Sequence, residues 1–298
     1  MLTEGLEPVT GHELVEWRRE VSMATAVGGC HAILCLLTDH VTKDVIDSGA
    51  PGLRVVANVA VGYDNVDVGA AAANGVIVTN TPGLLDETTA DTAFVLILAA
   101  CRRTTDAEAA LRGSRWAGWE LDGFLGVDVH GAELGLVGYG RIAQAVARRA
   151  RGFGMHVRHH ARRPTGEAGY VDSLEELLAT ADVVSIHVPL TPETHHLIDA
   201  TRLALMKPTA VLINTARGPV VDEGALALAL ESGRIFGAGL DVYDGEPSVH
   251  PRLLAAPHVT LLPHIGSATR ATRVAMVRLA AENIAAVLAG EPPLTPVR

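Results

Sequence analysis

The sequence predicts an α/β protein with a doubly wound parallel sheet, and two observations lead to this prediction. The first is a strand, a glycine turn and a helix in direct succession, at residues 133–150 with the sequence ELGLVGYGRIAQAVARRA. The second is an alternation of short apolar runs with helical stretches on both sides of that segment. Such alternation is typical of parallel sheets, because each helix returns the chain to the starting edge of the sheet.

Ahead of the glycine turn, the pattern predicts a first group of strands and helices. Strands are expected at residues 13–17, 31–37, 54–60 and 76–79, and helices at residues 42–48 and 65–74. A glycine follows each of these helices, at a position where helices commonly end. A strongly apolar helix is then expected at residues 87–103, and we interpret it as packed between domains or subunits.

An aromatic loop separates this helix from the glycine turn. It carries Trp116, Trp119 and Phe124, although aromatic residues make up only 4% of the chain. Such a cluster indicates a lid or an interface, while packing of the tryptophans on their own domain is equally open.

Beyond the turn, the alternation continues to the end of the chain. Strands are expected at residues 155–160, 183–189, 210–216, 236–242 and 259–262, and a last helix at residues 271–289. Asp222 is typical of a helix N-cap and predicts a helix through residues 225–230 that ends at Gly233. These strands predict a nucleotide domain whose ligand lies at the carboxyl ends of the strands.

The turn itself has the composition of a pyrophosphate-binding loop. Gly138 and Gly140 permit a tight turn and a close backbone approach, and Ala143 is small enough for the helix to pack on the strand. The first helical turn then presents free N–H groups to an anion. Taken alone, the motif is equally compatible with an ordinary glycine-rich turn.

Length and composition exclude several classes of protein. A chain of 298 residues, 48% of them hydrophobic, is sufficient for two globular domains. The net charge of −10 argues against a nucleic-acid or anionic-membrane surface. The longest apolar run is too short to span a bilayer, and the first residues lack the pattern of a signal peptide. Cys30, Cys35 and Cys101 form no CxxC pair and indicate reduced thiols in the cytoplasm.

Three polar residues, Arg217, Glu246 and His264, stand at the ends of consecutive expected strands. A guanidinium can bind a carboxylate or a carbonyl oxygen. A histidine beside a carboxylate is a suitable acid, because the anion favours the charged imidazolium. Taken singly, each residue is more often an ordinary loop residue. Together, beside a nicotinamide, they have what the reduction of a 2-keto acid requires.

The chain resembles the D-isomer-specific 2-hydroxyacid dehydrogenases, and most closely the glyoxylate/hydroxypyruvate reductases. The resemblance extends from about residue 32 to residue 293, and its motifs include ANVAVGYDNVD, GYGRIAQAVARR, INTARGPVVDE, GLDVYDGEP and LPHIGSAT. It implies that Arg217, Glu246 and His264 are catalytic. It also implies that the backbone N–H groups of Val61 and Gly62, together with Arg217, bind the substrate.

The same resemblance implies the cofactor contacts and the reaction. Asp241 would hold the nicotinamide carboxamide, and Thr89 would lie near the phosphates. The expected cofactor-binding residues are Thr89, Gly138, Tyr139, Gly140, Arg141, Ile142, Ala161, Arg162, Arg163, His187, Val188, Pro189, Thr194, Thr215, Ala216, Asp241, His264 and Gly266. The reaction would transfer a hydride from NAD(P)H to a small 2-keto acid, with glyoxylate and hydroxypyruvate as the first candidates.

The resemblance implies an architecture as well. A smaller flavodoxin-like substrate-binding domain, residues 1–81 and 269–298, would receive a Rossmann-type dinucleotide-binding domain, residues 82–268, as an insertion. The active site would lie between the two domains. Such enzymes are usually homodimers, and in the closest relatives a tryptophan of the loop at 116–119 reaches the neighbouring subunit. Relatives normally begin with an additional strand and helix, so part of the substrate sheet is expected to be absent here.

The end of the second nucleotide-domain strand decides the cofactor. NAD sites usually carry an acidic residue there, about 20 residues after the glycines, to accept a bond from the ribose hydroxyl. This chain has Ala161, Arg162 and Arg163 instead, with no acid before Glu167. Two arginines suit a 2′-phosphate, so we expect a preference for NADPH. If the two arginines are exposed to solvent and do not contact the cofactor, the chain would use NADH as well as NADPH.

Other interpretations stay open from the sequence alone. The chain could reduce another 2-keto acid such as 2-ketogluconate or a D-lactate precursor, or it could be a non-catalytic dinucleotide-sensing regulator on the same fold. An inactive, shortened paralogue is a third alternative. A metal site is not expected, because the histidines at 156, 159, 160, 195 and 196 lack the spacing and acidic neighbours of known sites.

Overall fold

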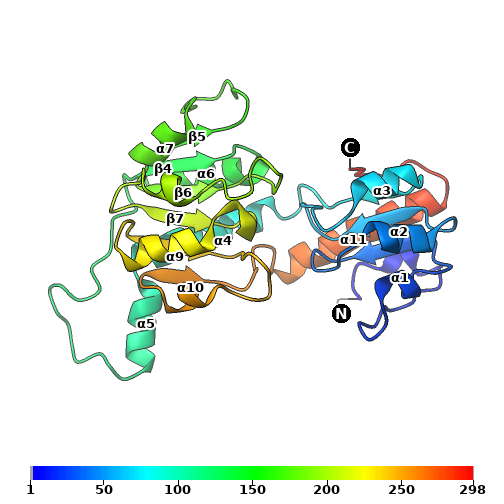
Figure 1. The fold of residues 1–298 in the computed structure, drawn as a ribbon, viewed down its shortest axis with the longest axis horizontal. Helices are drawn as coiled ribbons and strands as arrows, with labels where there is room; N and C mark the ends of the chain where they lie inside the picture. Colours follow the sequence, from blue (N-terminus) through cyan, green and yellow to red (C-terminus); the bar gives the residue numbers. More distant parts are fainter. Residues whose placement is uncertain (1–2, 298) are drawn as a thin grey trace. The chain divides into compact units, whose positions relative to one another are not determined.

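The computed structural model describes residues 3–297 and divides the chain into two compact units. Unit 1 comprises Met1–Leu85 and Ser267–Arg298, and unit 2 comprises Asp86–Gly266. Unit 2 is therefore a continuous stretch of chain, whereas unit 1 is assembled from both ends of the sequence. In Figure 1 the blue and red parts of the ribbon meet in unit 1.

Unit 2 is built on a six-stranded parallel sheet with the strand order β5-β4-β6-β7-β8-β9. The strands are β4 (Glu133–Val137), β5 (His156–His160), β6 (Val183–Ile186), β7 (Val211–Asn214), β8 (Gly237–Leu240) and β9 (Val259–Leu261). The strand order reverses between β4 and β6, because β5 lies on the other side of β4. In open α/β sheets, ligands bind at such a switch point, at the carboxyl ends of the strands.

Helices cover both faces of this sheet (Figure 1). The helices of unit 2 are α4 (Asp86–Cys101), α5 (Thr104–Arg112), α6 (Arg141–Gly152), α7 (Leu174–Thr180), α8 (Ala200–Leu203), α9 (Glu223–Glu231) and α10 (Pro251–Ala255), of which α5 packs mainly on α4. Alternate strand residues belong to different cores: Leu134 and Leu136 pack with α4 and α6, whereas Val137 packs with α7 and α9. A sheet buried on both faces explains the near-continuous apolar runs in the sequence.

Unit 1 contains a three-stranded parallel sheet in the order β1-β2-β3. Its elements are the short 3-10 helix η1 (Glu7–Val9), α1 (Met23–Ala26), β1 (Ala32–Cys35), α2 (Lys43–Gly49), β2 (Val55–Asn58), α3 (Val68–Ala73), β3 (Ile77–Thr79) and α11 (Arg270–Leu288). Helix α11, from the far end of the sequence, packs on β1 and β2. The C-terminal tail then pairs with β3 through a bridge between Thr79 and Pro296.

The strand expected at residues 13–17 does not form, and the prediction was wrong there. The segment has no regular structure, and Leu14 and Val15 are 57% and 72% exposed. A short strand needs a neighbouring strand to bury one face, and this segment pairs with none in the part of the chain that the structure describes. It is held locally instead, where the Trp17 indole donates a hydrogen bond to the carbonyl oxygen of Val21 at 2.8 Å.

The aromatic loop follows α5, which leaves the sheet of unit 2 together with it (Figure 1). Its side chains are largely exposed: Trp116 by 57%, Trp119 by 81% and Leu121 by 83%. The loop tryptophans therefore do not pack on their own unit. Within residues 3–297, no helix combines the length and the apolar character needed to cross a membrane.

Candidate active site

A close polar contact joins two of the expected catalytic residues, His264 and Glu246. The imidazole Nδ1 lies 2.7 Å from the Glu246 Oε2, and both side chains are about one quarter exposed, 26% and 25%. Burial raises the pKa of Glu246, but the bonds from His264 and from the backbone N–H of Tyr243 outweigh it, so the pKa lies below its usual value. Glu246 is therefore an anion at neutral pH, and it leaves the opposite nitrogen of His264, Nε2, to face a substrate.

Arg217 belongs to the same group. It follows β7, and its positive charge also lowers the pKa of Glu246. The turn that carries it is stabilised by the buried side chain of Asn214, which donates to the Arg217 carbonyl oxygen at 2.9 Å and accepts from the Ala216 N–H at 3.0 Å. These bonds fix the position of the Arg217 backbone at the carboxyl end of β7.

Gly218 explains how closely the two loops approach. A Cβ at this position would lie 1.8 Å from the carbonyl carbon of Tyr243. The backbone after Arg217 therefore touches the backbone just before Glu246, and no side chain fits between them. This contact keeps the arginine and the glutamate on one side of the sheet.

Asp241 shapes the loop that carries the histidine. Its two carboxylate oxygens accept hydrogen bonds from the N–H groups of Ile265 at 2.7 Å and of Gly266 at 2.8 Å. Its carbonyl oxygen accepts from the His264 N–H at 2.9 Å. His264 itself has φ = 52°, a left-handed conformation that costs energy for a residue other than glycine. The bonds that Asp241 accepts hold the histidine in this conformation.

The glycine turn between β4 and α6 has the features of a dinucleotide site. Gly138 has φ = 90°, and a Cβ there would lie 2.5 Å from the His187 carbonyl oxygen. At Gly140, the N-cap of α6, a Cβ would meet nothing within 4 Å, and no side chain caps the helix. The N–H groups of the first turn are therefore open to an anion. In addition, the buried Thr215 Oγ1, after β7, has no hydrogen-bond partner.

Other expected cofactor residues have partners within the chain. Arg141 forms an ion pair with Asp86, with Nε and Oδ2 3.1 Å apart. The Thr194 hydroxyl donates to the Pro189 carbonyl oxygen at 2.6 Å and accepts from the Thr191 N–H at 2.8 Å. These bonds stabilise the loop at residues 189–194. Burial lowers the pKa of His187 to about 4, and the ring is neutral. The side chains of Arg141 and Thr194 would have to exchange these partners to bind a cofactor directly.

The loop expected to hold the ribose is anchored by a histidine that sequence reasoning did not assign. His159 is fully buried at the end of β5 and stacks on Tyr139 of the glycine turn, with ring centroids 3.7 Å apart. Its Nε2 lies 2.7 Å from the Thr165 Oγ1. Arg162 and Arg163 are exposed between these anchors. Hydrogen bonds from the Thr191 side chain and from its own backbone N–H lower the pKa of Glu193, and the charge of Arg162 makes the smallest contribution, so this acid lies within electrostatic range of the arginine.

In unit 1, the expected substrate loop is held by two asparagines. Asn58 donates to the Gly62 carbonyl oxygen at 2.8 Å, and Asn80 donates to the Val61 carbonyl oxygen at 2.7 Å. Among the hydrogen bonds of residues 3–297, none uses the N–H group of Val61 or Gly62. With both carbonyl groups held, these two N–H groups can serve an anionic ligand.

No group of three or more metal-ligating side chains occurs in the part of the chain that the structure describes. The expected catalytic residues Arg217, Glu246 and His264 all lie in unit 2. Two expected substrate-binding residues, Val61 and Gly62, lie in unit 1.

A comparison with protein families assigns the second unit. Residues 94–266 match the model for the D-isomer specific 2-hydroxyacid dehydrogenase, NAD binding domain. The chain belongs to this family. The resemblance identified from the sequence motifs is thereby confirmed, as is the Rossmann-type fold predicted from the glycine turn.

Individual relatives agree with this assignment over most of the chain. A glyoxylate reductase of Thermococcus litoralis is 48% identical over 272 residues, which cover 88% of this chain and 82% of the relative. A crystal structure of a protein from Thermus thermophilus is 46% identical, with a TM-score of 0.89 and coverage of 95% and 91%. An NADPH-dependent glyoxylate/hydroxypyruvate reductase of Sinorhizobium meliloti, solved with NADP and malonate, is 41% identical, with a TM-score of 0.83 and coverage of 89% and 83%.

Proposed function

We propose that this chain reduces small 2-keto acids, glyoxylate and hydroxypyruvate first, to 2-hydroxy acids with NADPH as the reductant. The observation that carries the proposal is the pair of His264 and Glu246, 2.7 Å apart, beside Arg217 on the sheet of a dinucleotide-binding unit. A regulator that only senses a dinucleotide has no need for an acid supported by a carboxylate.

The residues act on the keto acid in distinct ways. When bound, the nicotinamide cofactor supplies a hydride to C2 of the substrate. Arg217 binds the carboxylate and the carbonyl oxygen of the keto acid, and stabilises the negative charge that develops on that oxygen. His264 gives the proton at Nε2 to the same oxygen. Glu246 holds the imidazole through Nδ1 and favours its charged form before the transfer.

The N–H groups of Val61 and Gly62 bind the substrate carboxylate in this proposal. The support is that their carbonyl groups are held by Asn80 and Asn58, while no hydrogen bond among the described residues uses the two N–H groups. Unit 1 is then the substrate-binding domain, and unit 2 is the dinucleotide-binding domain.

The preference for NADPH rests on Arg162 and Arg163, with Ala161 in the place of an acid. Glu193 opposes this preference, because its charge interacts with that of Arg162. The Glu193→Gln variant should therefore bind NADPH more tightly and NADH unchanged. Equal gains for both cofactors would show that Arg162 does not contact the 2′-phosphate.

The chain also forms a homodimer and acts in the cytoplasm in this proposal. The dimer is supported by the exposed loop after α5, where Trp119 is 81% exposed, because large exposed apolar side chains mark interaction surfaces. The cytoplasm is supported by the free thiols of Cys35 and Cys101, for which burial raises the pKa to about 12. Light scattering of the wild type and of Trp119→Ser tests the dimer, which the substitution should weaken.

Oxidation of NADPH in the presence of glyoxylate tests the activity itself. The wild type should turn over, and His264→Gln should lower kcat by roughly 10²–10⁴-fold, the usual contribution of general acid–base catalysis. The dissociation constant for NADPH, measured by fluorescence, should stay the same, because the acid acts on the substrate oxygen. A panel of 2-keto acids that includes 2-ketogluconate identifies the preferred substrate. Absence of turnover by the wild type with every acid of the panel would contradict the proposal.

A further inference from the structure

The segment that carries Arg162 and Arg163 has few contacts of its own. It leaves the sheet after His160, the last residue of β5, and the chain pairs with β5 again at Gly169. Residues 162–164 and 166–169 are exposed. Among the backbone hydrogen bonds of residues 3–297, none uses residues 161–164. The position of the two arginines therefore depends on where the rest of the segment is attached.

Thr165 is the point of attachment within this segment. Its Oγ1 lies 2.7 Å from the Nε2 of His159 and accepts a hydrogen bond from the Glu167 N–H at 3.2 Å. Thr165 is half-buried, whereas the residues on either side of it are exposed. Because Arg163 stands only two residues from this hydroxyl, the bond to His159 limits how far the arginines can move.

His159 is a rigid partner for Thr165. Its ring is fully buried and stacks on Tyr139 of the glycine turn, with ring centroids 3.7 Å apart. Its backbone holds the returning chain, because its N–H donates to the Gly169 carbonyl oxygen at 2.9 Å and its carbonyl oxygen accepts from the Val171 N–H at 2.8 Å. One residue thus holds the middle and the end of the segment and joins both to the glycine turn.

Neither side chain of this contact is charged at neutral pH. Burial is the largest influence on His159 and lowers its pKa below the usual value, so the ring is neutral. The threonine hydroxyl is neutral as well. Loss of the contact would therefore change positions within the segment without changing the charge that a 2′-phosphate meets.

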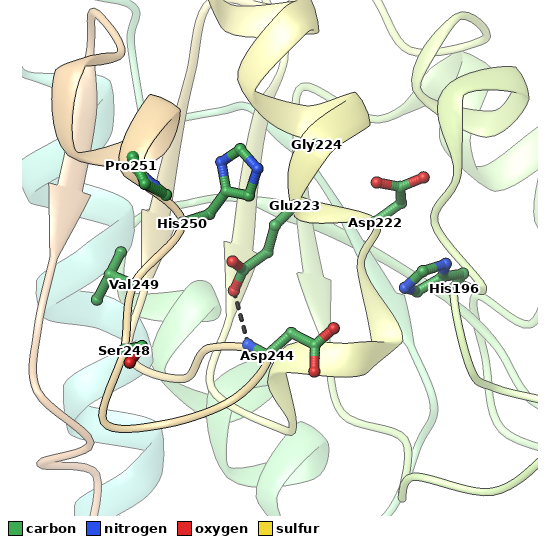
Figure 2. Close-up of a pocket in the computed structure, with 9 residues that line it drawn as sticks. All are labelled: His196, Asp222, Glu223, Gly224, Asp244, Ser248, Val249, His250 and Pro251. Carbon is green, nitrogen blue, oxygen red and sulfur yellow. Dashed lines mark hydrogen bonds between the residues drawn. The ribbon is translucent and has the colours of Figure 1, made fainter.

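The cavity of unit 2 does not enclose the arginines. It has a volume of about 270 Å³ and lies between the start of α9 and residues 244–251 (Figure 2), and none of residues 161–169 lines it. Arg162 and Arg163 would thus meet a cofactor at an exposed surface. There a mobile backbone would add to the conformational entropy that two arginine side chains lose on binding. A fixed segment reduces this loss.

We propose that the hydrogen bond between His159 and Thr165 determines the cofactor preference, because it holds the two arginines where they face the 2′-phosphate of NADPH. His159 and Thr165 are positioning residues in this scheme, and neither touches the phosphate. The inference rests on the preference for NADPH in the proposed function, and it names the residues that make the arginines effective. Binding of NADH, which lacks the phosphate, does not depend on this contact.

Thr165→Val tests the contact, because it removes the hydroxyl and both of its bonds but keeps the shape of the side chain. Fluorescence titration gives the dissociation constants for NADPH and NADH. Calorimetry gives that for 2′,5′-ADP, which carries the phosphate without a nicotinamide. Thr165→Val should weaken NADPH and 2′,5′-ADP by the same factor, roughly 3–10-fold, which corresponds to one lost hydrogen bond, and leave NADH unchanged. Thr165→Ser keeps the hydroxyl and should match the wild type.

His159→Phe breaks the same bond from the other side. Its aromatic ring can still stack on Tyr139, so the same selective loss of NADPH and 2′,5′-ADP is expected. Added to Thr165→Val, it should cause little further loss, because the bond is already absent. If His159→Phe keeps wild-type affinities while Thr165→Val does not, the hydroxyl binds the phosphate itself, and the inference is overturned.

A protein that lacks both arginines separates positioning from direct contact even if His159→Phe does not fold. In the Arg162→Ala, Arg163→Ala background, Thr165→Val should weaken 2′,5′-ADP no further, and an additional loss there overturns the inference. Equal losses of NADPH and NADH with a lower melting temperature would show a structural role and overturn it as well.

The outcome for the wild type distinguishes this inference from the proposed function. A wild type that binds both cofactors equally contradicts the proposed preference and the inference with it. A wild type that prefers NADPH, with the preference unchanged in Thr165→Val, overturns the inference alone. None of these readouts needs turnover, so binding as expected without reduction of any keto acid would refute the proposed reaction and still support the positioning role.

Discussion

Replacing Glu246 by glutamine removes the negative charge beside His264. The glutamine oxygen can still accept a bond from the Nδ1 of His264, but its NH₂ group then faces the Tyr243 N–H, so one backbone hydrogen bond is lost together with the charge. Hydrogen bonds to charged groups contribute about 1.5–3 kcal/mol and neutral ones about 0.5–1.5 kcal/mol, so the change removes about 1–1.5 kcal/mol. One pH unit corresponds to about 1.4 kcal/mol, which predicts a shift of about one unit.

The direction follows from the charge that is removed. In the proposed mechanism, reduction requires the imidazolium of His264, and the substitution removes the anion that stabilises it, so the alkaline limb of the reduction profile should move to lower pH. Glu246 also makes the stability of the fold depend on pH. Its pKa is lower in the folded protein than in the unfolded chain. Its contribution to the free energy of unfolding is therefore present above the unfolded-state pKa and is lost as the pH falls through the folded-state pKa. The stability difference between wild type and variant should therefore vanish in acid.

The assay is steady-state reduction of glyoxylate by NADPH between about pH 5 and pH 9, with chemical denaturation of both proteins over the same range. Glu231→Gln serves as the control, since its carboxylate pairs with Arg252 on the surface. If the profiles of Glu246→Gln and the wild type superimpose, the carboxylate does not support the acid, and the reasoning about the pair is refuted.

Three further predictions concern the cofactor, the close loop contact and the start of the chain. Ala161→Asp should reverse the ratio of kcat/KM for NADPH and NADH, whereas Arg162→Ala should only narrow it; a wild type that uses both cofactors equally contradicts this. Gly218→Ala should lower kcat and the melting temperature together, because its Cβ would lie 1.8 Å from the carbonyl carbon of the neighbouring loop, and a variant with wild-type values would refute the contact. Hydrogen exchange should be fast across residues 13–17 and slow across β1, since the first segment is exposed and irregular; equal protection would be the contrary result.

Much of unit 2 was predictable because its signals are local. An apolar run followed by glycines and a periodic helix marks β4 and α6, and Asp222 does cap α9 by accepting a hydrogen bond from the Ala225 N–H. The contact between His264 and Glu246 was predictable for another reason: the carboxyl ends of neighbouring parallel strands share one edge of a sheet.

What escaped prediction depends on contacts of side chains with groups that are distant in the sequence. Glu223 binds an amide 21 residues away, and Arg141 pairs with Asp86 across two elements. Neither leaves a periodic pattern in the sequence. The stack of His159 on Tyr139 escaped for the same reason. The strand at residues 13–17 was predicted wrongly because a few apolar residues do not supply a neighbouring strand.

The division of the chain into a continuous and a discontinuous unit sets an order of events on the ribosome. All residues of unit 2 have been synthesised before α11, which covers β1 and β2 of unit 1. Domains fold as units during synthesis. Unit 2 can therefore close its core while unit 1 still waits for its last helix and for Thr295, whose hydroxyl donates to the Asn80 carbonyl oxygen at 2.6 Å. A nascent chain stalled before α11 should yield a protease-resistant fragment of unit 2 alone.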